Sequence, residues 1–418
     1  MSKSIAPALG DVTLSTAERE SIDSIVSRLR RAASSFLSPD RSAAALARAC
    51  GLWRDPNYQR RRSAIAQISA NSGLSEALLS ESLKALLLPF SAPALESFAA
   101  KVKSASRLIG FVMPGNVVGA GMHELVQALV SGAAVLVKCA SSEPVFFIEF
   151  ARTIAELYPE LAARISVLAF GRDNRELTRA MQKNCDAMVV LGDDDTVDIL
   201  GRSGNVIGFG SRVSGALISR EALAPGAIDA VSDGLARDIT LFEQRGCLSP
   251  HHVFVASATE GETRHFAGRI ARSLDQLAQK LLPPRTIDVG AAAAIRSTRE
   301  AARWRKLAGA AVDLWESNEF SWSVIYDSTC AFRISPLYRT VFVAPVLDFA
   351  DFTARLEPVS GHLEGFAIVD RAGRFEDERA WLRDAGVSYF AEPGMMQSPP
   401  LEWPHGGGAF LNRLVACG

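Results

Sequence analysis

From about Arg107 onward, short apolar runs alternate with helical segments. RLIGFVM and AVLVK are each followed by a helix-like stretch, at 125–131 and 146–157, and ISVLAF and DAMVVLG continue the series. Strand–helix alternation with short connections is typical of βαβ units and predicts a parallel, doubly wound sheet. Because such sheets bind ligands at the carboxyl ends of their strands, the residues that follow each strand are the first candidates for a site.

A second α/β block begins near Asp229. Its pattern predicts helices at 227–242 and 259–282 and strands at HHVFVAS, VIYD, TVFVAPVLD, FAIVD and VSYF. Pro283-Pro284 and the alanine run 291–294 are expected to mark loops or helix ends. The predicted organisation is therefore an N-terminal segment and two α/β domains followed by a C-terminal segment, with bounds 1–95, 96–228, 229–390 and 391–418.

The first 90 or so residues have a helical pattern and no catalytic motif. A capping box at Ser15–Glu18 precedes Ile22, Ile25, Val26 and Leu29 at helical spacing. Further helical patterns cover 42–53 and 75–88. We expect this segment to be a helical layer that packs on the next domain.

Charge and hydropathy exclude several classes of function. Lys+Arg number 45 against 46 Asp+Glu, and no basic block stands out, so a nucleic-acid partner or an anionic-membrane surface is not expected. The longest apolar run, 125–137, is short and interrupted by Gln127, Ser131 and Gly132, and predicts no membrane span. The N-terminus lacks the pattern of a signal peptide, so we expect a cytoplasmic protein.

The six cysteines are scattered and include no C-x-x-C pair, which argues against a zinc knuckle and against a disulfide framework. No metal site is expected, and each cysteine is either core filler or a reactive thiol. Cys247, in EQRGCLSPHHVFV, is distinctive because Gly246 precedes it and a Leu-Ser-Pro turn leads from it into a strand. A cysteine at such a bend can expose its sulfur and offer its own backbone N–H to an oxyanion. His251 and His252 lie on that strand with side chains on opposite faces, and either is a minor candidate for a base.

Three turns after predicted strands carry polar residues. In VMPGNVVGAG the glycine spacing is not G-x-G-x-x-G, so a plain tight turn competes with a phosphate-binding one, and the Asn116 amide is a candidate oxyanion donor. In AVLVKCASSEP, Lys138 and the serines suit ribose or phosphate, although a surface lysine is an equal alternative. In VVLGDDDTVDIL, Asp193–Asp195 either cap a helix or, less simply, bind magnesium.

In this order, these pieces resemble the aldehyde dehydrogenase superfamily. Pro114-Gly115-Asn116 is similar to its Pro-Trp-Asn motif, and Lys138 to the lysine of its Lys-Pro-x-Glu motif, although Cys139 replaces the proline. Gly192 matches its Gly-Ser-Thr turn and Cys247 its nucleophile. The resemblance implies an α/β fold with two doubly wound domains, an N-terminal helical segment and a small oligomerisation element.

Within that superfamily the chain is similar to the LuxC-type fatty acyl-CoA reductases, from about Lys101 to the C-terminus. The stretches that carry this likeness are QRGCLSPHHVFV, HLEGFAIVD and AGVSYFAEPGMMQSPPLEWPHGGG. The resemblance implies reduction of an acyl-CoA or acyl-carrier-protein thioester to an aldehyde through a thioester on Cys247, and a homo-oligomer. It implies that the Asn116 side chain donates a hydrogen bond to the oxyanion. It also implies that the nicotinamide cofactor is bound by Pro114, Gly115, Lys138, Ser141, Ser142 and Gly192. No acid lies between Lys138 and Glu143, which favours NADPH, with NADH as the alternative.

Two departures from the superfamily bear on the direction of the reaction. The region NVIGFGSRVSGALIS, which matches the place of the water-activating glutamate, has no acid, and Arg339-Thr340 stands where a second carboxylate is expected. Without a base to activate water, a thioester on Cys247 persists long enough to be reduced. Glu221 and Glu243 are the nearest acids in the sequence. Two other functions remain open: an acyl-phosphate reductase, and a silent partner of an acyl-activating enzyme or carrier protein.

Overall fold

The computed structural model describes residues 22–103, 106–202, 204–282 and 287–416, which form two compact units. The first unit contains the chain up to Glu76, Leu86–Ser211 and the chain from Pro400. The second contains Ala77–Ala85 and Arg212–Pro399. Each unit is built around one sheet.

The sheet of the first unit is parallel throughout, with the strand order β3-β2-β1-β4-β5. Its strands are β1 (Leu108–Val112), β2 (Ala134–Cys139), β3 (Ile165–Ala169), β4 (Ala187–Leu191) and β5 (Val206–Phe209). The first four are buried along their whole length, because helices cover both faces, and this explains their continuous apolar runs. The parallel, doubly wound sheet predicted from the strand–helix alternation is confirmed.

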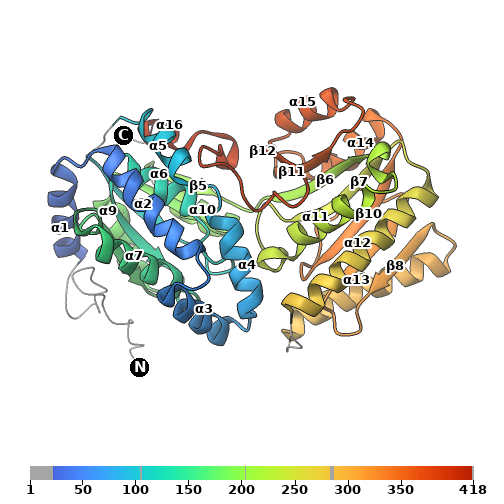
Figure 1. Ribbon diagram of the computed structural model, residues 1–418, viewed down its shortest axis with the longest axis horizontal. Coiled ribbons are helices and arrows are strands. Elements are labelled where there is room, and N and C mark those ends of the chain that lie inside the picture. The colour runs from blue at the N-terminus through green and yellow to red at the C-terminus, as the bar shows by residue number, and fades with distance from the viewer. Residues whose placement is uncertain (1–21, 104–105, 203, 283–286, 417–418) are drawn as a thin grey trace. The chain divides into compact units, whose positions relative to one another are not determined.

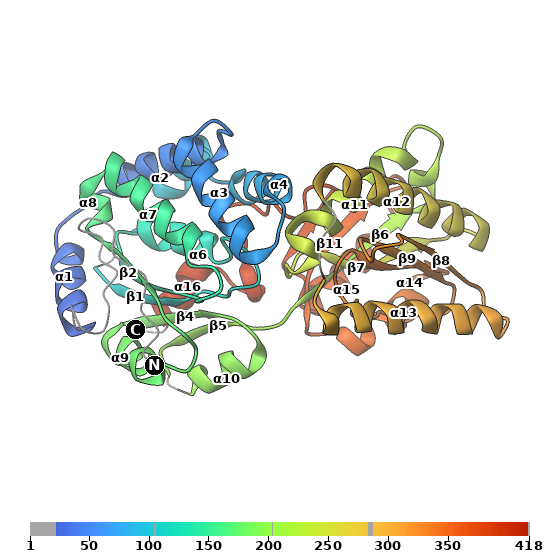
Figure 2. The same ribbon diagram turned by 90° about the horizontal axis from the view of Figure 1, so that it is seen from below.

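Helices of the first unit lie on both sides of this sheet (Figures 1 and 2). Those on one side are α6 (Met122–Val130) and α7 (Val145–Leu157), with α2 (Pro39–Arg54), α3 (Gln59–Ser72) and α5 (Ala92–Ala99) packed further out. Those on the other side are α1 (Ile22–Ser34), α9 (Arg175–Asn184) and α10 (Asp194–Gly201). The short α8 (Pro159–Ala162), the 3-10 turn η4 (His405–Gly407) and α16 (Phe410–Ala416) complete the unit.

The expected helical layer near the N-terminus is confirmed where the structure describes it. Ser38 caps α2, with Pro39 in its first turn, and the buried Trp53 packs edge-on against Phe146. The helix expected at 75–88 is α4 (Glu76–Leu87). The capping box at Ser15–Glu18 lies outside the described residues.

One stretch of the chain, 76–99, is long and apolar enough to cross a membrane by length and composition alone. It contains α4 and α5, and its leucines Leu78, Leu79, Leu83 and Leu87 are buried in the fold. Core helices of soluble proteins pass the same test, so this is weak evidence. The expectation of no membrane span stays a prediction.

The sheet of the second unit has the strand order β12-β11-β6-β7-β10-β9-β8. Its strands are β6 (Val213–Ser219), β7 (Pro250–Ala256), β8 (Val312–Glu316), β9 (Ser323–Asp327), β10 (Thr340–Val346), β11 (Leu363–Val369) and β12 (Tyr389–Ala391). All neighbours are parallel except β8 and β9. Helices cover both faces of this sheet as well, which makes a second doubly wound α/β layer.

In the second unit, α11 (Ile228–Thr240) and α12 (Glu260–Leu281) cover one face of the sheet (Figure 2). The other face carries α13 (Val289–Leu307), α14 (Phe349–Leu356) and α15 (Glu376–Asp384). Three 3-10 turns connect these elements: η1 (Arg220–Leu223), η2 (Leu241–Gln244) and η3 (Glu357–Val359).

The division into units differs from the predicted bounds at several points. Strand β6 lies before the predicted boundary at 228/229 but belongs to the second sheet, and 389–391 form its edge strand β12. The alanine run 291–294 lies inside α13, whose first amides donate to Asp288. Alanine has the highest helix propensity of all residues, so the prediction of a loop there was wrong, and only the end-of-helix alternative is near the observed start. Pro283-Pro284 lies outside the described residues.

Candidate functional site

Cys247 lies at the amino end of β7, a central strand of the second sheet between β6 and β10. Its side chain is partly exposed, whereas the other cysteines that the structure describes are buried: Cys50, Cys139, Cys185 and Cys330. Burial raises the pKa of the Cys50 and Cys185 thiols to about 12 and that of Cys330 to about 11. It raises the pKa of Cys139 further still. Cys417 is outside the described residues. The predicted reactive cysteine is therefore set apart from these four by its surroundings.

Three hydrogen bonds fix the backbone around Cys247. The Ser214 hydroxyl on β6 donates to the Cys247 carbonyl oxygen at 2.7 Å and accepts from the Gly365 amide of β11 at 3.0 Å. The Ser249 amide closes the turn onto the Gly246 carbonyl at 3.0 Å. The Cys247 amide itself has no hydrogen-bond partner among the residues that the structure describes. That N–H is therefore available to an oxyanion formed on an acyl group at the sulfur.

The turn that leads into Cys247 has an unusual backbone. Phe242, Glu243 and Gln244 have φ values of 53°, 58° and 62°, in the left-handed region. For residues other than glycine each such conformation costs roughly 1–3 kcal/mol, so it persists only where the surroundings impose it. The Gln244 amide nitrogen donates to the carbonyls of Pro250 and Thr340, both at 2.8 Å, and so ties the turn to the starts of β7 and β10.

A buried ion pair holds the same turn. The Glu243 carboxylate lies 2.9 Å from the Arg339 guanidinium, and the two side chains are 0% and 1% exposed. Arg339 ends a second left-handed run, Leu337–Arg339, with φ values of 67°, 52° and 59°. Arg245 donates to the Tyr338 hydroxyl at 3.0 Å and so joins the two runs a second time. Arg339, which stands where the second carboxylate was expected, is thus the ion-pair partner of Glu243, four positions before Cys247.

The C-terminal segment supports the cysteine turn from another side. The Gln397 amide nitrogen lies 3.2 Å from both the Ser249 hydroxyl and the Asp238 carbonyl. The Asp238 carboxyl accepts from the amides of Gly394, at 2.6 Å, and Met396, at 3.1 Å. Burial raises the pKa of Asp238 to about 7, against the opposing effect of these two amides.

Neither histidine after Cys247 is placed as a base. His251 accepts a hydrogen bond from the Ser335 amide at 3.0 Å, and burial lowers its pKa to about 4. The His252 ring is fully buried and stacks on Phe254 with the ring centroids 4.1 Å apart, and burial lowers its pKa well below the ordinary value. Both rings are packed in the core, which disfavours the minor alternative that one of them is a catalytic base.

The nearest acids in the sequence are not poised at Cys247 either. Glu221 lies in η1, after the carboxyl end of β6, whereas Cys247 precedes the amino end of the parallel strand β7. The two residues are therefore at opposite edges of the sheet. Glu243 is buried in its pair with Arg339.

The proposed cofactor residues lie together at the carboxyl edge of the first sheet. Pro114 and Gly115 follow β1, Lys138 and Ser142 lie at and beyond the end of β2, and Gly192 follows β4. Since β1 lies between β2 and β4, these turns are neighbours, and the strand order reverses between β1 and β4. This is where doubly wound sheets bind ligands. A Cβ on Gly115 would lie 2.7 Å from the Ala140 Cβ and 2.1 Å from the Ser142 hydroxyl, so a side chain here would push the two turns apart.

The polar side chains at this edge differ in exposure. Lys138 is buried with its amine 5.5 Å from the Phe170 ring centroid, and burial lowers its pKa, so it is not the surface lysine of the alternative reading. Ser141, Ser142 and Asn116 are exposed. Asn116 belongs to the first unit and Cys247 to the second.

The acidic turn after β4 caps a helix. Asp193 accepts from the Thr196 amide at 2.8 Å and pairs with Arg172 at 3.2 Å. The capping interpretation of Asp193–Asp195 is thus confirmed for Asp193. Among the described residues, no group of three His, Cys, Asp or Glu side chains is arranged to hold a metal ion.

Sequence reasoning missed four residues around Cys247: Ser214, Asp238, Arg339 and Gln397. Their contacts join residues 33 to 159 positions apart, which no local pattern reveals. Arg339 had one signal, because it occupies the place of an expected carboxylate. Gln397 lies in the closing stretch that carries the family likeness.

Comparisons with known proteins show the family to which the chain belongs. The family model described as "Acyl-CoA reductase (LuxC)" matches residues 92–417. The chain belongs to the LuxC family. It is 22% identical over 291 residues to the long-chain acyl-protein thioester reductase of Aliivibrio fischeri, covering 68% of this chain and 57% of that protein. It is 20% identical to long-chain acyl-protein thioester reductase 2 of Photobacterium leiognathi, covering 73% of this chain and 62% of that protein.

The matches span only 57% and 62% of the lengths of these two relatives. Among solved structures, the fold resembles an NAD-dependent benzaldehyde dehydrogenase from Corynebacterium glutamicum, with a TM-score of 0.64 at 16% identity. That match covers 89% of this chain and 85% of the other. The aldehyde dehydrogenase-like fold expected from the motifs is confirmed.

Proposed function

We propose that this LuxC-family chain reduces an acyl thioester to the aldehyde, with Cys247 as the nucleophile. The observation that carries the proposal is the partly exposed Cys247 at the amino end of a central strand, with its own amide unpaired among the described residues. The names of the curated relatives support an acyl-protein thioester as substrate, and acyl-CoA is the other donor of the same chemistry.

Covalent catalysis would begin with attack of the Cys247 thiolate on the donor's carbonyl carbon. The new C–S bond forms, the oxyanion accepts hydrogen bonds from the Cys247 amide and the Asn116 side-chain amide, and the donor's C–S bond then breaks. The departing thiolate takes up a proton and leaves as the free thiol. The acyl group remains on Cys247 as a thioester, and after its reduction the Cys247 thiolate departs from the aldehyde carbon.

A reduced nicotinamide cofactor would supply the hydride for that reduction. The residues at the carboxyl edge of the first sheet fit such a group: Gly115 lets the turn after β1 lie against Ala140 and Ser142 of the turn after β2, and Ser141 and Ser142 are exposed shortly after Lys138 in the chain. We favour NADPH over NADH because the nearest acid, Glu143, is buried and accepts from the Phe146 amide at 3.0 Å. It is therefore not free to bind a ribose 2′-hydroxyl, and a 2′-phosphate would meet Lys138 instead.

The position of the acids supports the reductive direction. Hydrolysis of a Cys247 thioester needs a base beside the attacking water, and such a base contributes roughly 10²–10⁴-fold. Glu221 lies at the opposite sheet edge, and Glu243 is buried against Arg339. The thioester on Cys247 would therefore persist until it is reduced or until its acyl group is transferred back to a thiol.

The test is an intact-mass spectrum of the protein after mixing with acyl-CoA and acyl-carrier-protein donors in the absence of cofactor. We expect one acyl adduct, mapped by peptide digestion to Cys247, and none in Cys247→Ala. Cys185→Ala removes a buried thiol and is the matched control, which should acylate as the wild type does. Turnover that survives in Cys247→Ala, or an adduct on Cys139 or Cys185, would refute the mechanism. An adduct formed only from acyl phosphates would indicate the acyl-phosphate reductase.

A further inference from the structure

The Glu243–Arg339 ion pair is part of a continuous set of polar contacts along the amino edge of the second sheet. The Arg339 carbonyl accepts from the Ser323 amide at 3.0 Å, and the Arg339 guanidinium also donates to the Ser321 carbonyl. The Ser323 hydroxyl in turn accepts from Arg299 of α13 at 2.8 Å. Arg339 is thus held on its backbone and on its side chain.

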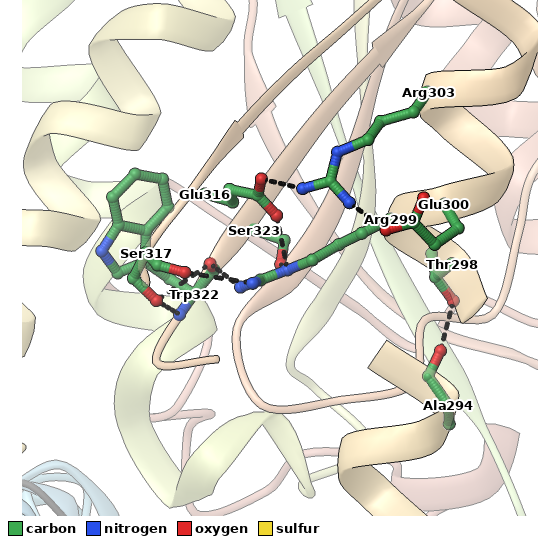
Figure 3. Close-up of polar contacts among 9 residues, drawn as sticks. All are labelled: Ala294, Thr298, Arg299, Glu300, Arg303, Glu316, Ser317, Trp322 and Ser323. Atoms are coloured by element: carbon green, nitrogen blue, oxygen red, sulfur yellow. Dashed lines mark hydrogen bonds and ion pairs between the residues drawn. The ribbon is translucent and has the colours of Figure 1, made fainter. Parts of the chain in front are cut away.

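Arg299 anchors the outer end of this set (Figure 3). Its guanidinium donates to the carbonyls of Trp322, at 2.9 Å, and Ser317, at 3.0 Å, and lies 3.1 Å from the Glu316 carboxylate. Arg303 pairs with the same glutamate. The contacts therefore run from a helix on one face of the sheet, through the starts of β9 and β10, to the turn that precedes Cys247.

The cysteine turn needs such support. Three consecutive residues in the left-handed region are each unfavourable, so this backbone would relax if nothing held it. Gln244 holds it through two neutral hydrogen bonds, and Glu243 through a charged pair that water does not reach. Glu243 faces Arg339 at 2.9 Å and a second, more distant cation, Arg245, at 3.7 Å. Removing one member of a buried pair leaves its charge poorly compensated, so Arg339, the nearer and fully buried partner, is the residue that keeps Glu243 inside.

We propose that Glu243 is a positioning residue for Cys247 and not its base, and that it acts through Arg339 to hold the left-handed turn in which the nucleophile is presented. The proposal rests on the proposed function of Cys247. The Glu243 carboxylate is already engaged by two guanidinium groups, that of Arg339 at 2.9 Å and that of Arg245 at 3.7 Å. Its full burial also denies it contact with a water that would attack the thioester.

The experiment compares Glu243→Gln with the wild type in single-turnover acylation of Cys247, read by intact mass without cofactor. Glutamine keeps the shape of the side chain and removes its charge. We expect acylation to slow by roughly 10²-fold, since a misplacement of about 1 Å costs a reaction on this order. The rate of Cys247 alkylation, measured as a function of pH, should rise at the same pH in both proteins but reach a lower plateau in Glu243→Gln. The affinity for NADPH should stay unchanged.

The matched control is Asp351→Asn. Asp351 pairs with Arg355 at 2.8 Å within α14, after the carboxyl end of β10 and so at the opposite edge of the same sheet. Its loss should lower the melting temperature and leave the acylation rate unchanged. A purely structural role for Glu243 would make the two variants behave alike.

Two further variants test the pairing. Arg339→Lys keeps the positive charge and should retain more acylation than Arg339→Gln, and it keeps the proposal testable if Glu243→Gln does not fold. Because Arg339→Gln leaves the buried Glu243 with only the more distant Arg245 at 3.7 Å, the double variant E243Q/R339Q should acylate faster and melt higher than R339Q alone.

Two outcomes would overturn the proposal. One is Glu243→Gln acylating at the wild-type rate. The other is normal acylation with a Cys247 thioester that survives many times longer than in the wild type, which is the signature of a lost hydrolytic base. Both differ from failure of the proposed function, in which wild-type Cys247 takes no acyl group at all.

Discussion

At the scale of single residues, the reactivity assigned to Cys247 comes from its surroundings and not from its type. Four other cysteines lie in the described structure, and burial raises the pKa of each thiol, which keeps them as uncharged core residues. Cys247 is partly exposed, it precedes the strand that begins at Pro250, and its carbonyl is held by Ser214. A fixed backbone with an available amide is what an oxyanion requires.

Asn116→Ala tests the other proposed oxyanion donor. Loss of one donor typically slows acyl transfer by about 10²–10³-fold, because its hydrogen bond forms only as charge develops on the oxygen. The affinity for NADPH should change little. Ser141→Ala is the contrasting variant, expected to weaken NADPH binding and leave cofactor-free acylation intact. The rate is measured by quenched-flow mass spectrometry, and unchanged acylation in Asn116→Ala would remove this residue from the site.

At the scale of elements, the sequence predicts the strands that are buried on both faces and misses those whose pairing depends on neighbouring strands. The strands β1, β2 and β4 are readable because both faces are covered and every position is apolar. Strand β8 was missed because it is an antiparallel edge strand that carries Asp313 and Glu316. The alanine-rich start of α13 gave no amphipathic pattern to recognise.

The same distinction applies to the site. Cys247 and the turns after β1, β2 and β4 were found because each stands at the end of a strand that the sequence shows. The partnership of Glu243 with Arg339 could not be found, since it spans 96 positions and exists only because β10 lies beside β7. Strand order is a property of the assembled sheet. The unexpected arginine was visible in the sequence, but its partner was not.

A pH prediction belongs to the contact between α11 and the C-terminal segment. Burial raises the pKa of Asp238 from 3.8 to about 7, so folding takes up a proton between those values. The stability from this group is therefore fully present below pH 4 and is lost as pH rises toward 7, by up to roughly 4 kcal/mol. Asp238→Asn should lack this slope. Urea unfolding midpoints of both proteins from pH 5 to 8 measure it, and equal slopes would contradict the assignment.

At the scale of the whole molecule, the proposed chemistry is divided between two units. The proposed nucleophile lies at the amino edge of the second sheet and the cofactor candidates at the carboxyl edge of the first. Ala77–Ala85 of the N-terminal helices belongs to the second unit, where the Ser82 hydroxyl accepts from the Phe242 amide at 3.1 Å. From Pro400 the chain returns to the first unit, where His405 lies 2.9 Å from the buried Glu124. Neither unit is a continuous piece of sequence.

The last prediction is that the chain associates with copies of itself. In the superfamily that it resembles, the segment matching the chain from Val387 extends the sheet of a neighbouring subunit. Here β12 pairs with β11 on one side and ends the sheet on the other. An edge strand presents backbone donors and acceptors that a second chain can pair with. Light scattering at micromolar concentration should give at least twice the 44.9 kDa of one chain, and the mass should fall on dilution if the contact is weak. A mass of one chain across the whole series would show that this edge has no partner of its own kind.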